Sequence, residues 1–448
     1  MNQPAGSSPC IQDGKEIAEF MKQISLYAQQ PSGFSAAQLR KALENSIEGL
    51  SLRKVLLIPP DYTRFHSGAG IITNMYEHML RDAGCTVDIL PALGTHAPMT
   101  REECAEMYGD IPFEEFLVHN WRTDVVRLGE VPGSFVSEIS EGLVNTPIAV
   151  EVNRLLLDPS YDLILSIGQV VPHEVVGMAN RNKNIFVGCG GSDMINSSHM
   201  LGAFYGMERI MGRDHTPVRR VFDYAEEHFL RDVPLAYVLT VTTRTAAPEN
   251  IGHGICIHGL FIGRERSLFE AAVRLSQEKN LEHVTEPFQK AVVYLDEKEF
   301  KSTWLGNKSV YRTRMAIADG GELVVLAPGV ERFGEDADID GLIRKYGYVG
   351  RERILRFVEE NQDLKENLSA AAHLIHGSSD GRFRITYCTK HLTREEVEGV
   401  GFAYMPYEEA VQKYDPAKLT DGYHVLPDGE RIFYISNPAL GLWSAAEF

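Results

Sequence analysis

The stretch KVLLIPPDYTRFHSGAGIITNMYEHMLRDAG, residues 54–84, decides the fold class of this chain. Its first five residues are apolar apart from Lys54 and predict a buried strand, which the loop PPDYTR follows directly. From Gly70 to Ala83 the apolar side chains recur at helical spacing, and Gly84 predicts the end of a helix. A strand, a loop and a helix in this order are typical of an α/β fold.

The same alternation continues along the chain. TVDILPAL (86–93) and YDLILSIG (161–168) predict further strands. Thr100, with Glu103 three residues later, forms a capping-box pattern at the start of a short helix. Strands that alternate with helices predict largely parallel sheets. In such sheets the ligand site lies at the carboxyl ends of the strands.

Three polar loops follow predicted strands, and we expect them to meet at one edge of a sheet: PPDYTR (59–64), GTHAPMT (94–100) and GQVVPH (168–173). The first thirty residues predict a loose lead-in with one short helix. The polar stretch QEKNLEHVTEPFQ (277–289) predicts a linker.

A second α/β unit is expected beyond that linker, with SVYRTRMAIADGG (309–321) as a helix and ELVVLAP (322–328) as a strand. The sequence therefore predicts two α/β domains, residues 1–283 and 284–448, with largely parallel sheets and an active-site cleft between them.

The overall composition excludes several classes of partner. A formal net charge of -18 argues against nucleic acid or an anionic membrane surface as the main ligand. The N-terminal residues lack the pattern of a secretory signal, and no window is long and apolar enough to span a membrane. The six cysteines are scattered without a CxxC pair, which indicates free thiols in a reducing cytoplasm.

Polar side chains cluster at the end of the first predicted strand. Arg64 carries a planar fork that suits a carboxylate or a phosphate. Asp61 lies three residues earlier, and a local salt bridge between the two is the simpler interpretation. His66 and Ser67 follow in the same loop.

Two histidines and a lysine lie in or after the other two loops. His96 lies within GTHAPMT, and His173 follows Pro172. A neutral imidazole with a pKa of about 6.5 can take or give a proton at cellular pH. Each histidine can instead only bond the backbone of its own loop. Lys183 lies in NRNKN, where a solvated lysine is the common outcome.

A glycine cluster, VGCGGSDM (187–194), precedes a predicted helix. Backbone N–H groups at Gly190 and Gly191 can hold a phosphate at such a helix start, or the glycines can form only a tight turn. His199 lies on that helix, either as a ligand or as a partly buried helix histidine.

Two generic functions fit these residues. A hydrolytic metal site of His96, His173 and His199 lacks an HExxH motif and a neighbouring carboxylate ligand. A nucleotide- or sugar-binding protein without catalysis accounts for the glycines and Arg64, but it leaves two well-placed histidines without a role.

Taken together, the motifs resemble the nickel-dependent lactate racemase family, whose members carry a nickel-pincer nucleotide. The matching pieces are DYTR (61–64), GTHAPMT (94–100), PHEVVGMANRNK (172–183) and His199, sixteen residues beyond Lys183. Lys308 is a further match in the C-terminal part. The resemblance covers most of the chain and implies an isomerase, a racemase or epimerase of 2-hydroxy acids that works by reversible hydride transfer.

The resemblance also implies a role for each matching residue. Lys183 would hold the nickel-pincer nucleotide covalently, and His199 would be the protein ligand of nickel. His96 and His173 would be the two acid–base residues, one for each hand of the substrate. Nickel(II) favours the planar sulfur, carbon and nitrogen donors of such a site.

The remaining roles concern charge and partners. Arg64 and Lys308 would bind the substrate carboxylate or stabilise charge near it. Arg64 would also contact the cofactor. Asp61 would hold a polar group of the cofactor, and Gly190 and Gly191 would approach its phosphate. Cofactor-maturation proteins are expected partners of a cytoplasmic enzyme, and a homo-oligomer is compatible with the sequence.

Several positions depart from the family pattern. Ala97 follows His96 where the family has an arginine, and ANRN (179–182) replaces a glycine-rich run before Lys183. Leu305 stands where the family has a glutamine.

After DYTR, residues 65–67 replace a proline. His66, Ser67 and Trp304 are therefore candidate substrate-binding residues. The tether, ligand and base positions are kept, whereas these substrate-facing positions differ. We therefore expect a substrate other than lactate. A polar sugar acid such as gluconate, epimerised at carbon 2, suits the polar residues. A racemase of lactate or another short 2-hydroxy acid is the alternative, and a non-catalytic binding protein is a further one.

Overall fold

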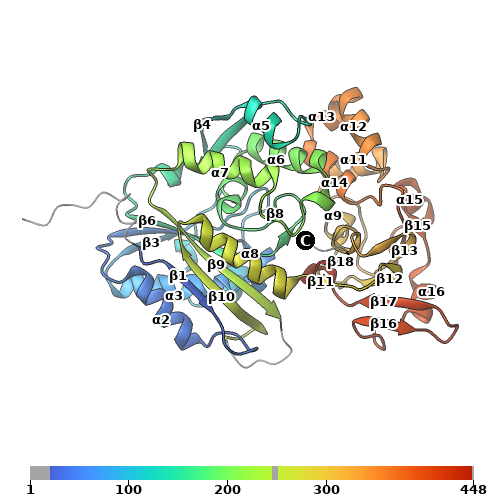
Figure 1. Ribbon diagram of the computed structural model, residues 1–448, viewed down its shortest axis with the longest axis horizontal. Helices are drawn as coiled ribbons and strands as arrows, with labels where there is room; N and C mark the ends of the chain where they lie inside the picture. Colours follow the sequence, from blue (N-terminus) through green and yellow to red (C-terminus); the bar gives the residue numbers. More distant parts are fainter. Residues whose placement is uncertain (1–20, 245–250, 446–448) are drawn as a thin grey trace, which may run out of the picture.

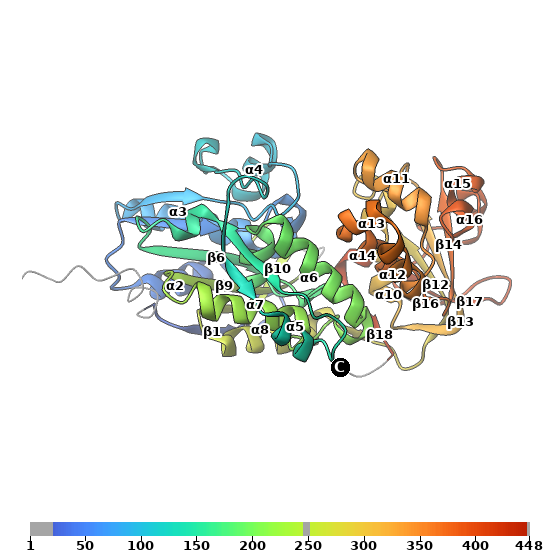
Figure 2. The same cartoon turned by 90° about the horizontal axis from the view of Figure 1, so that it is seen from above.

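The computed structural model describes residues 21–244 and 251–445 (Figure 1). In this part of the chain two six-stranded sheets lie side by side, each with its own helices (Figures 1 and 2). We call them the N-terminal sheet and the C-terminal sheet. The predicted α/β class with largely parallel sheets is confirmed.

The N-terminal sheet has the strand order β1-β10-β9-β6-β2-β3. The pairs β9–β6, β6–β2 and β2–β3 are parallel, and the pairs β1–β10 and β10–β9 are antiparallel. Its strands are β1 (Ile24–Tyr27), β2 (Lys54–Ile58), β3 (Thr86–Ile89), β6 (Leu163–Gln169), β9 (Leu235–Arg244) and β10 (Ile255–Gly263).

Helices cover both faces of this sheet, because its central strands are apolar on both sides. Along β2, Val55 and Leu57 pack toward α2 and α3, whereas Leu56 and Ile58 pack toward α7 and α8. The helices are α2 (Ala36–Ile47), α3 (Ala69–Asp82), α4 (Arg101–Tyr108), α5 (Gly133–Ile139), α6 (Ser192–Tyr205), α7 (Pro217–Phe229) and α8 (Arg266–Asn280). The predicted capping box at Thr100 and Glu103 is present at the start of α4.

The C-terminal sheet has the order β15-β14-β13-β12-β17-β16 and is parallel except for its edge strand β16. Its strands are β12 (Phe288–Tyr294), β13 (Ile317–Ala327), β14 (Arg384–Thr389), β15 (Ala403–Tyr404), β16 (Gly422–Val425) and β17 (Arg431–Ile435). Its helices are α9 (Thr303–Gly306), α10 (Lys308–Thr313), α11 (Ala337–Tyr346), α12 (Arg351–Glu360), α13 (Gln362–Glu366), α14 (Leu368–His376), α15 (Arg394–Gly399) and α16 (Tyr407–Lys413).

Helix α6 joins the two halves. It packs against α14, and its side chains Met200 and Ala203 belong to the apolar core of the C-terminal sheet. Arg351 donates to the carbonyl oxygen of Phe204 at 2.5 Å, and the Arg314 guanidinium lies 2.7 Å from a carboxylate oxygen of Glu208. The helix that carries His199 is therefore shared between the two lobes.

Short pairs of strands complete the fold. β11, within the predicted linker, pairs in parallel with β18 near the end of the chain. These elements are β4 (Val125–Val131), β5 (Ile148–Asn153), β7 (Pro172–His173), β8 (Gly177–Met178), β11 (Glu282–His283) and β18 (Trp443–Ser444). The domain boundary after His283 stays a prediction.

Two predictions about elements are wrong. The helix expected over residues 309–321 ends at Thr313, and β13 begins at Ile317, because Ile317 is buried and pairs with Phe288 of β12. In the lead-in, the described residues 24–27 form β1, an edge strand on β10. The rest of that lead-in, residues 1–20, lies outside the described residues.

Two further observations bear on partners and redox state. Among the helices that the structure describes, none is long and apolar enough to cross a membrane. The five cysteines within the described residues are free and buried.

Candidate active site

The three loops singled out in the sequence meet at one edge of the N-terminal sheet. They follow β2, β3 and β6, which are parallel neighbours. Backbone hydrogen bonds link the region after β3 to the first loop and to the segment after Lys183: the N–H of Ala92 donates to the carbonyl of Pro59, and the N–H of Gly94 donates to the carbonyl of Gly188, both at 2.8 Å. The expected convergence is confirmed.

Asp61 and His96 form a pair between the first two loops. Oδ2 of Asp61 lies 2.5 Å from Nδ1 of His96, and Oδ1 accepts the Thr63 hydroxyl at 2.6 Å. Burial alone would raise the pKa of Asp61, but the hydrogen bond from His96 and nearby positive charge hold it below its ordinary value. The carboxylate of Asp61 accepts a hydrogen bond from Nδ1–H of His96. Nε2 of His96 therefore keeps a free lone pair.

Arg64 is not paired with Asp61, so the simpler sequence interpretation of a loop salt bridge is wrong. Only the Arg64 backbone N–H bonds Asp61, through the carbonyl oxygen at 3.0 Å. Its guanidinium has no hydrogen bond or ion pair with the residues that the structure describes. A partly buried guanidinium without a carboxylate is suited to an anionic ligand.

His173 is buried, with 6 % of its surface exposed. Its ring is held as the opposite tautomer to that of His96. The backbone N–H of Val175 donates to Nδ1 at 3.2 Å. The neutral ring therefore carries its proton on Nε2. Burial, opposed by Glu174 and reinforced by Lys183 and Arg64, holds the pKa of His173 well below its ordinary value, so the ring is neutral at neutral pH.

Lys183 is half-buried at the start of the short helix η4 (Asn184–Gly188). Its amine has no hydrogen bond or ion pair with described residues. Asn184, its neighbour, is fixed to the sheet, since Nδ2 donates to the Ile58 carbonyl at 3.2 Å and to the Ser166 hydroxyl at 3.1 Å. Burial and the charge of Arg64 lower the pKa of Lys183 to about 8. The amine is therefore partly neutral near neutral pH.

His199 is partly buried on α6. Its Nδ1 lies 2.6 Å from the carbonyl oxygen of Ile195, one helical turn earlier. Nδ1 therefore carries the proton and Nε2 presents a lone pair. An imidazole whose other nitrogen is held by a carbonyl is the usual form of a metal-ligating histidine.

The glycines before α6 are needed for close packing. A Cβ at Gly190 would lie 1.8 Å from the carbonyl oxygen of Phe186, and one at Gly191 would lie 2.1 Å from Oε2 of Glu151. That same oxygen accepts the backbone N–H of Asp193 at 3.2 Å, at the start of α6. The tight-turn interpretation accounts for both glycines, and contact with a phosphate stays a prediction.

The C-terminal lobe contributes Lys308, at the first position of α10. Its Nζ lies 5.6 Å from the ring centre of Phe300. Burial, followed by the charges of Arg64 and Arg312, lowers the pKa of Lys308 to about 8. Because Arg64 belongs to the N-terminal lobe, its charge acts on Lys308 across the two lobes.

Sequence reasoning missed three residues near these groups. Glu174 is next to His173 in the chain, and although burial opposes it, the interactions with His173 and with the charge of Arg312 lower the pKa of its carboxylate. His376, at the end of α14, is 4 % exposed and its Nε2 has no partner among described residues. Glu174 lies within a quoted motif and Arg312 one turn after Lys308, so both could have been found, whereas His376 has no sequence signal.

The candidate substrate-binding residues are dispersed. His66 has a buried Nδ1 without a partner among the described residues, and burial together with the charges of Arg244 and His253 lowers its pKa to about 4. The Ser67 hydroxyl is buried and accepts the N–H of Ala69 at 3.1 Å, at the start of α3. Trp304 stacks on His373 with ring centres 4.3 Å apart. Ser67 thus has a local structural bond, and substrate contact by these residues stays a prediction.

The alternative hydrolytic site of three histidines is not formed. Within residues 21–244 and 251–445, the one group of three or more metal-ligating side chains with ligand atoms within 4.8 Å of one another is Asp214, His215 and Glu270. Ion pairs with Arg266 and His215 already engage Asp214.

This chain is similar to known lactate racemases. Residues 19–210 match the family model described as the lactate racemase N-terminal domain. The chain is 25 % identical over 246 residues to the lactate racemase of Lactiplantibacillus plantarum, an alignment that covers 52 % of this chain and 53 % of that protein. It thus spans about half the length of that relative.

Solved structures share the fold over nearly the whole chain. A protein from Thermotoga maritima superposes with a TM-score of 0.77 at 23 % identity, covering 93 % of this chain and 99 % of that one. The lactate racemase apoprotein from Thermoanaerobacterium thermosaccharolyticum superposes with a TM-score of 0.68 at 15 % identity, covering 94 % and 100 %.

Proposed function

We propose that this chain, whose residues 19–210 match the lactate racemase N-terminal domain, is a racemase or epimerase of a 2-hydroxy acid. One observation carries the proposal: His96 and His173 lie at the same strand edge in complementary states. The first presents a lone pair on Nε2, and the second presents an Nε2 proton. Taking a proton and giving one on two sides of a substrate is what inversion of a hydroxyl-bearing carbon requires.

The residues present fit a nickel-pincer nucleotide. The Lys183 amine has no protein partner among the described residues, and its lowered pKa leaves it partly neutral and nucleophilic. The His199 Nε2 lone pair is free because Nδ1 is bound to Ile195. Lys183 would hold the nucleotide and His199 would hold nickel. When bound, this cofactor supplies a hydride acceptor, so that the hydrogen on carbon 2 leaves and returns without a carbanion.

The following roles of the protein are part of the proposal. Arg64 and Lys308, from opposite lobes, hold the substrate carboxylate. Nε2 of His96 takes the hydroxyl proton, while Asp61 stabilises the imidazolium that forms. Nε2–H of His173 donates to the oxygen on the opposite side. For the other hand of substrate the two histidines exchange roles, which requires His173 to lose its bond from Val175.

The substrate class is proposed from the polar positions. We take it to be a polar sugar acid such as gluconate, epimerised at carbon 2. Among the described residues, Nδ1 of His66 and Nε2 of His376 are buried without a hydrogen-bond partner. Groups of this kind support a substrate with additional hydroxyls that can bond them. Lactate, which has no further hydroxyls, is the alternative substrate.

The test uses protein produced together with the cofactor-maturation proteins, which we propose as its partners in the cytoplasm. We expect nickel in the purified protein and an added mass on the peptide that contains Lys183, both absent from Lys183→Arg. A panel of lactate, malate, phenyllactate and aldonic acids then reports the substrate. Active, nickel-loaded enzyme with unmodified Lys183 would contradict the tether. Loaded enzyme that inverts none of these acids would contradict the function.

A further inference from the structure

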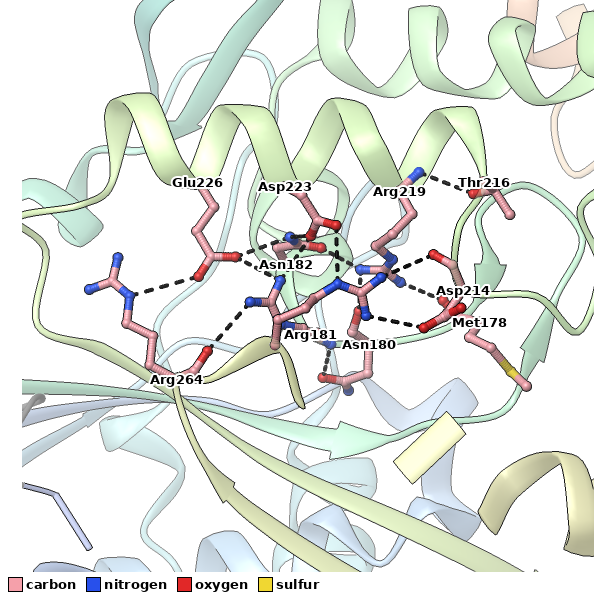
Figure 3. A network of polar contacts seen from close by, with 11 residues as sticks. Met178, Asn180, Arg181, Asn182, Asp214, Thr216, Arg219, Asp223, Glu226 and Arg264 are labelled. Carbon is pink, nitrogen blue, oxygen red and sulfur yellow. Dashed lines mark hydrogen bonds and ion pairs between the residues drawn. The ribbon is translucent and has the colours of Figure 1, made fainter. Parts of the chain in front are cut away.

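The segment before Lys183 lies against one face of α7, as Figure 3 shows. Three α7 side chains point toward it: Arg219, Asp223 and Glu226, spaced four and three residues apart. This spacing places them on one side of a helix. We call them the α7 clamp. In the sequence, the segment that they hold is the ANRN run that departs from the family pattern.

Arg219 binds the backbone of this segment. It is fully buried, and its guanidinium donates to the carbonyl of Met178 at 2.5 Å and to the carbonyl of Asn180 at 3.2 Å. It also donates to Oδ1 of Asn182. One planar fork therefore fixes three points in five residues, which a lysine ammonium in its place could not reproduce.

The two carboxylates of the clamp bind the side chains of the segment. Nη1 of Arg181 lies 2.9 Å from Asp223 and 3.0 Å from Glu226. Nδ2 of Asn182 donates to the same two carboxylates at 2.6 and 3.0 Å. These contacts are buried or nearly so, where a hydrogen bond to a charged group is worth more than in water.

The clamp acts on a strained backbone. Asn180 and Arg181 have φ values of 66° and 54°, in the left-handed region. Asparagine tolerates that region, but arginine adopts it only when its surroundings enforce it. Because Arg181 binds α7 and the carbonyl before it binds Arg219, the clamp supplies that enforcement.

Lys183 follows this segment directly, and its neighbours on both sides are held in place. On one side Asn182 is held by α7, and on the other Asn184 is held by the Ile58 carbonyl and Ser166. In NRNKN the lysine is thus the one residue whose side chain has no partner among the described residues. Burial and the charge of Arg64 lower the pKa of Lys183, and the charge of Arg219 lowers it further.

The clamp belongs to a larger network of charges. Four guanidinium groups and four carboxylates take part in it: Arg181, Arg219, Arg264 and Arg266, with Asp214, Asp223, Glu226 and Glu265. The charged or titratable groups that act on Lys183 or are acted on by it are Asp61, Arg64, His173, Glu174, His199 and Arg219.

We propose that the α7 clamp positions Lys183, fixing the backbone of residues 180–182 so that the lysine amine is presented, unpartnered and reactive, to the electrophilic group that it captures. Arg219, Asp223 and Glu226 are positioning residues in this proposal, since they act through the segment that they hold. The inference rests on the proposed role of Lys183 as the tether.

The experiment measures the reactivity of Lys183 in full-length protein made without the cofactor pathway. The probe is the N-hydroxysuccinimide ester of acetic acid: the amine forms an amide bond with the acetyl carbon and N-hydroxysuccinimide leaves. Peptide mass spectrometry gives the acetylation rate of Lys183 across pH 6–10. Lys345, an exposed lysine paired with Asp363, serves as the internal reference.

In the wild-type protein the Lys183 rate is expected to rise with a midpoint of about 8. Arg219→Lys and Asp223→Asn are expected to release Lys183 into solvent and to move its midpoint upward by about one to two pH units, which slows its acetylation below pH 8 by about 10- to 100-fold. Asp223→Glu, which keeps the carboxylate, should recover much of the rate. Glu227→Gln is the matched control on α7, since Glu227 is exposed and, within the described part of the chain, its carboxylate pairs with Arg231 and not with the segment before Lys183.

Circular dichroism and an unchanged Lys345 rate establish that a variant is folded. If Arg219→Lys does not fold, Asp223→Asn provides the test of the clamp, because it leaves the bonds of Arg219 to the backbone in place. A folded variant with the wild-type Lys183 rate and midpoint would overturn the clamp. Altered Lys183 reactivity together with loaded enzyme that never modifies this lysine would instead retain the clamp and overturn the tether.

Discussion

Replacing Lys308 by methionine should stabilise the cofactor-free protein. The folded structure lowers the pKa of Lys308 from 10.5 to about 8, through burial and the charge of Arg64. A pKa that is lower by one corresponds to about 1.4 kcal/mol, so the charged lysine destabilises the fold by at most about 3 kcal/mol. Partial exposure reduces this figure, and we expect a gain of about 1–3 kcal/mol for Lys308→Met at pH 7. Methionine has a similar length and packs against Phe300.

The sign of the pH dependence follows from the same lowered pKa. Below pH 8 the lysine is protonated in the folded and the unfolded protein, and the folded state bears the full cost. Between pH 8 and 10.5 the folded lysine loses its proton while the unfolded one keeps it, so wild-type stability rises relative to the variant. The advantage of Lys308→Met should therefore shrink across this window.

Urea unfolding followed by circular dichroism, at intervals from pH 7 to 9.5, measures the effect. The matched control is Lys345→Met, because Asp363 raises the pKa of that lysine and its loss should be neutral or destabilising. The variant Lys308→Met should also lose turnover, since in the proposed function the Lys308 ammonium holds the substrate carboxylate. Equal or lower stability of Lys308→Met at pH 7, or a pH-independent difference, would show that the site does not strain this lysine.

Three further outcomes are expected. Asp61→Asn leaves His96 without its carboxylate and favours the wrong tautomer, so turnover should fall by about 10²–10⁴-fold in both directions; Thr63→Val, which keeps the carboxylate, should cost far less, and near-normal turnover of Asp61→Asn would contradict the pair. His199→Ala should lose nickel while circular dichroism stays unchanged, and full metal content in that variant would point to another ligand. His66→Ala should reduce kcat/KM for an aldonic acid more than for lactate; an equal loss for both would remove His66 from substrate recognition.

The sequence predicts the edge of the N-terminal sheet well, for a physical reason. β2 and β6 are buried on both faces and form continuous apolar runs, so the polar loops after them are conspicuous. Since those strands are parallel neighbours, the loops must meet. That argument brings Arg64, His96 and His173 to one place without any side-chain geometry.

Other features cannot be predicted from local pattern. The Asp61–His96 bond joins residues 35 apart, and a local Asp61–Arg64 pair is equally plausible from the sequence alone. The helix expected through residue 321 is a strand because Ile317 pairs with Phe288, a tertiary contact that overrides local spacing. The α7 clamp joins two segments about 40 residues apart by polar contacts that leave no periodic signal.

A common construction links the candidate residues and separates an enzyme from a protein that only binds. In His96 and His199 one ring nitrogen is bound by Asp61 or by the Ile195 carbonyl, and the other nitrogen is left with its lone pair. His173 is fixed through Val175 so that its other nitrogen bears a proton instead. A binding pocket gains nothing from fixing three tautomers, because either tautomer bonds a hydroxyl. Proton transfer depends on the tautomer, so this arrangement favours catalysis over the non-catalytic alternative.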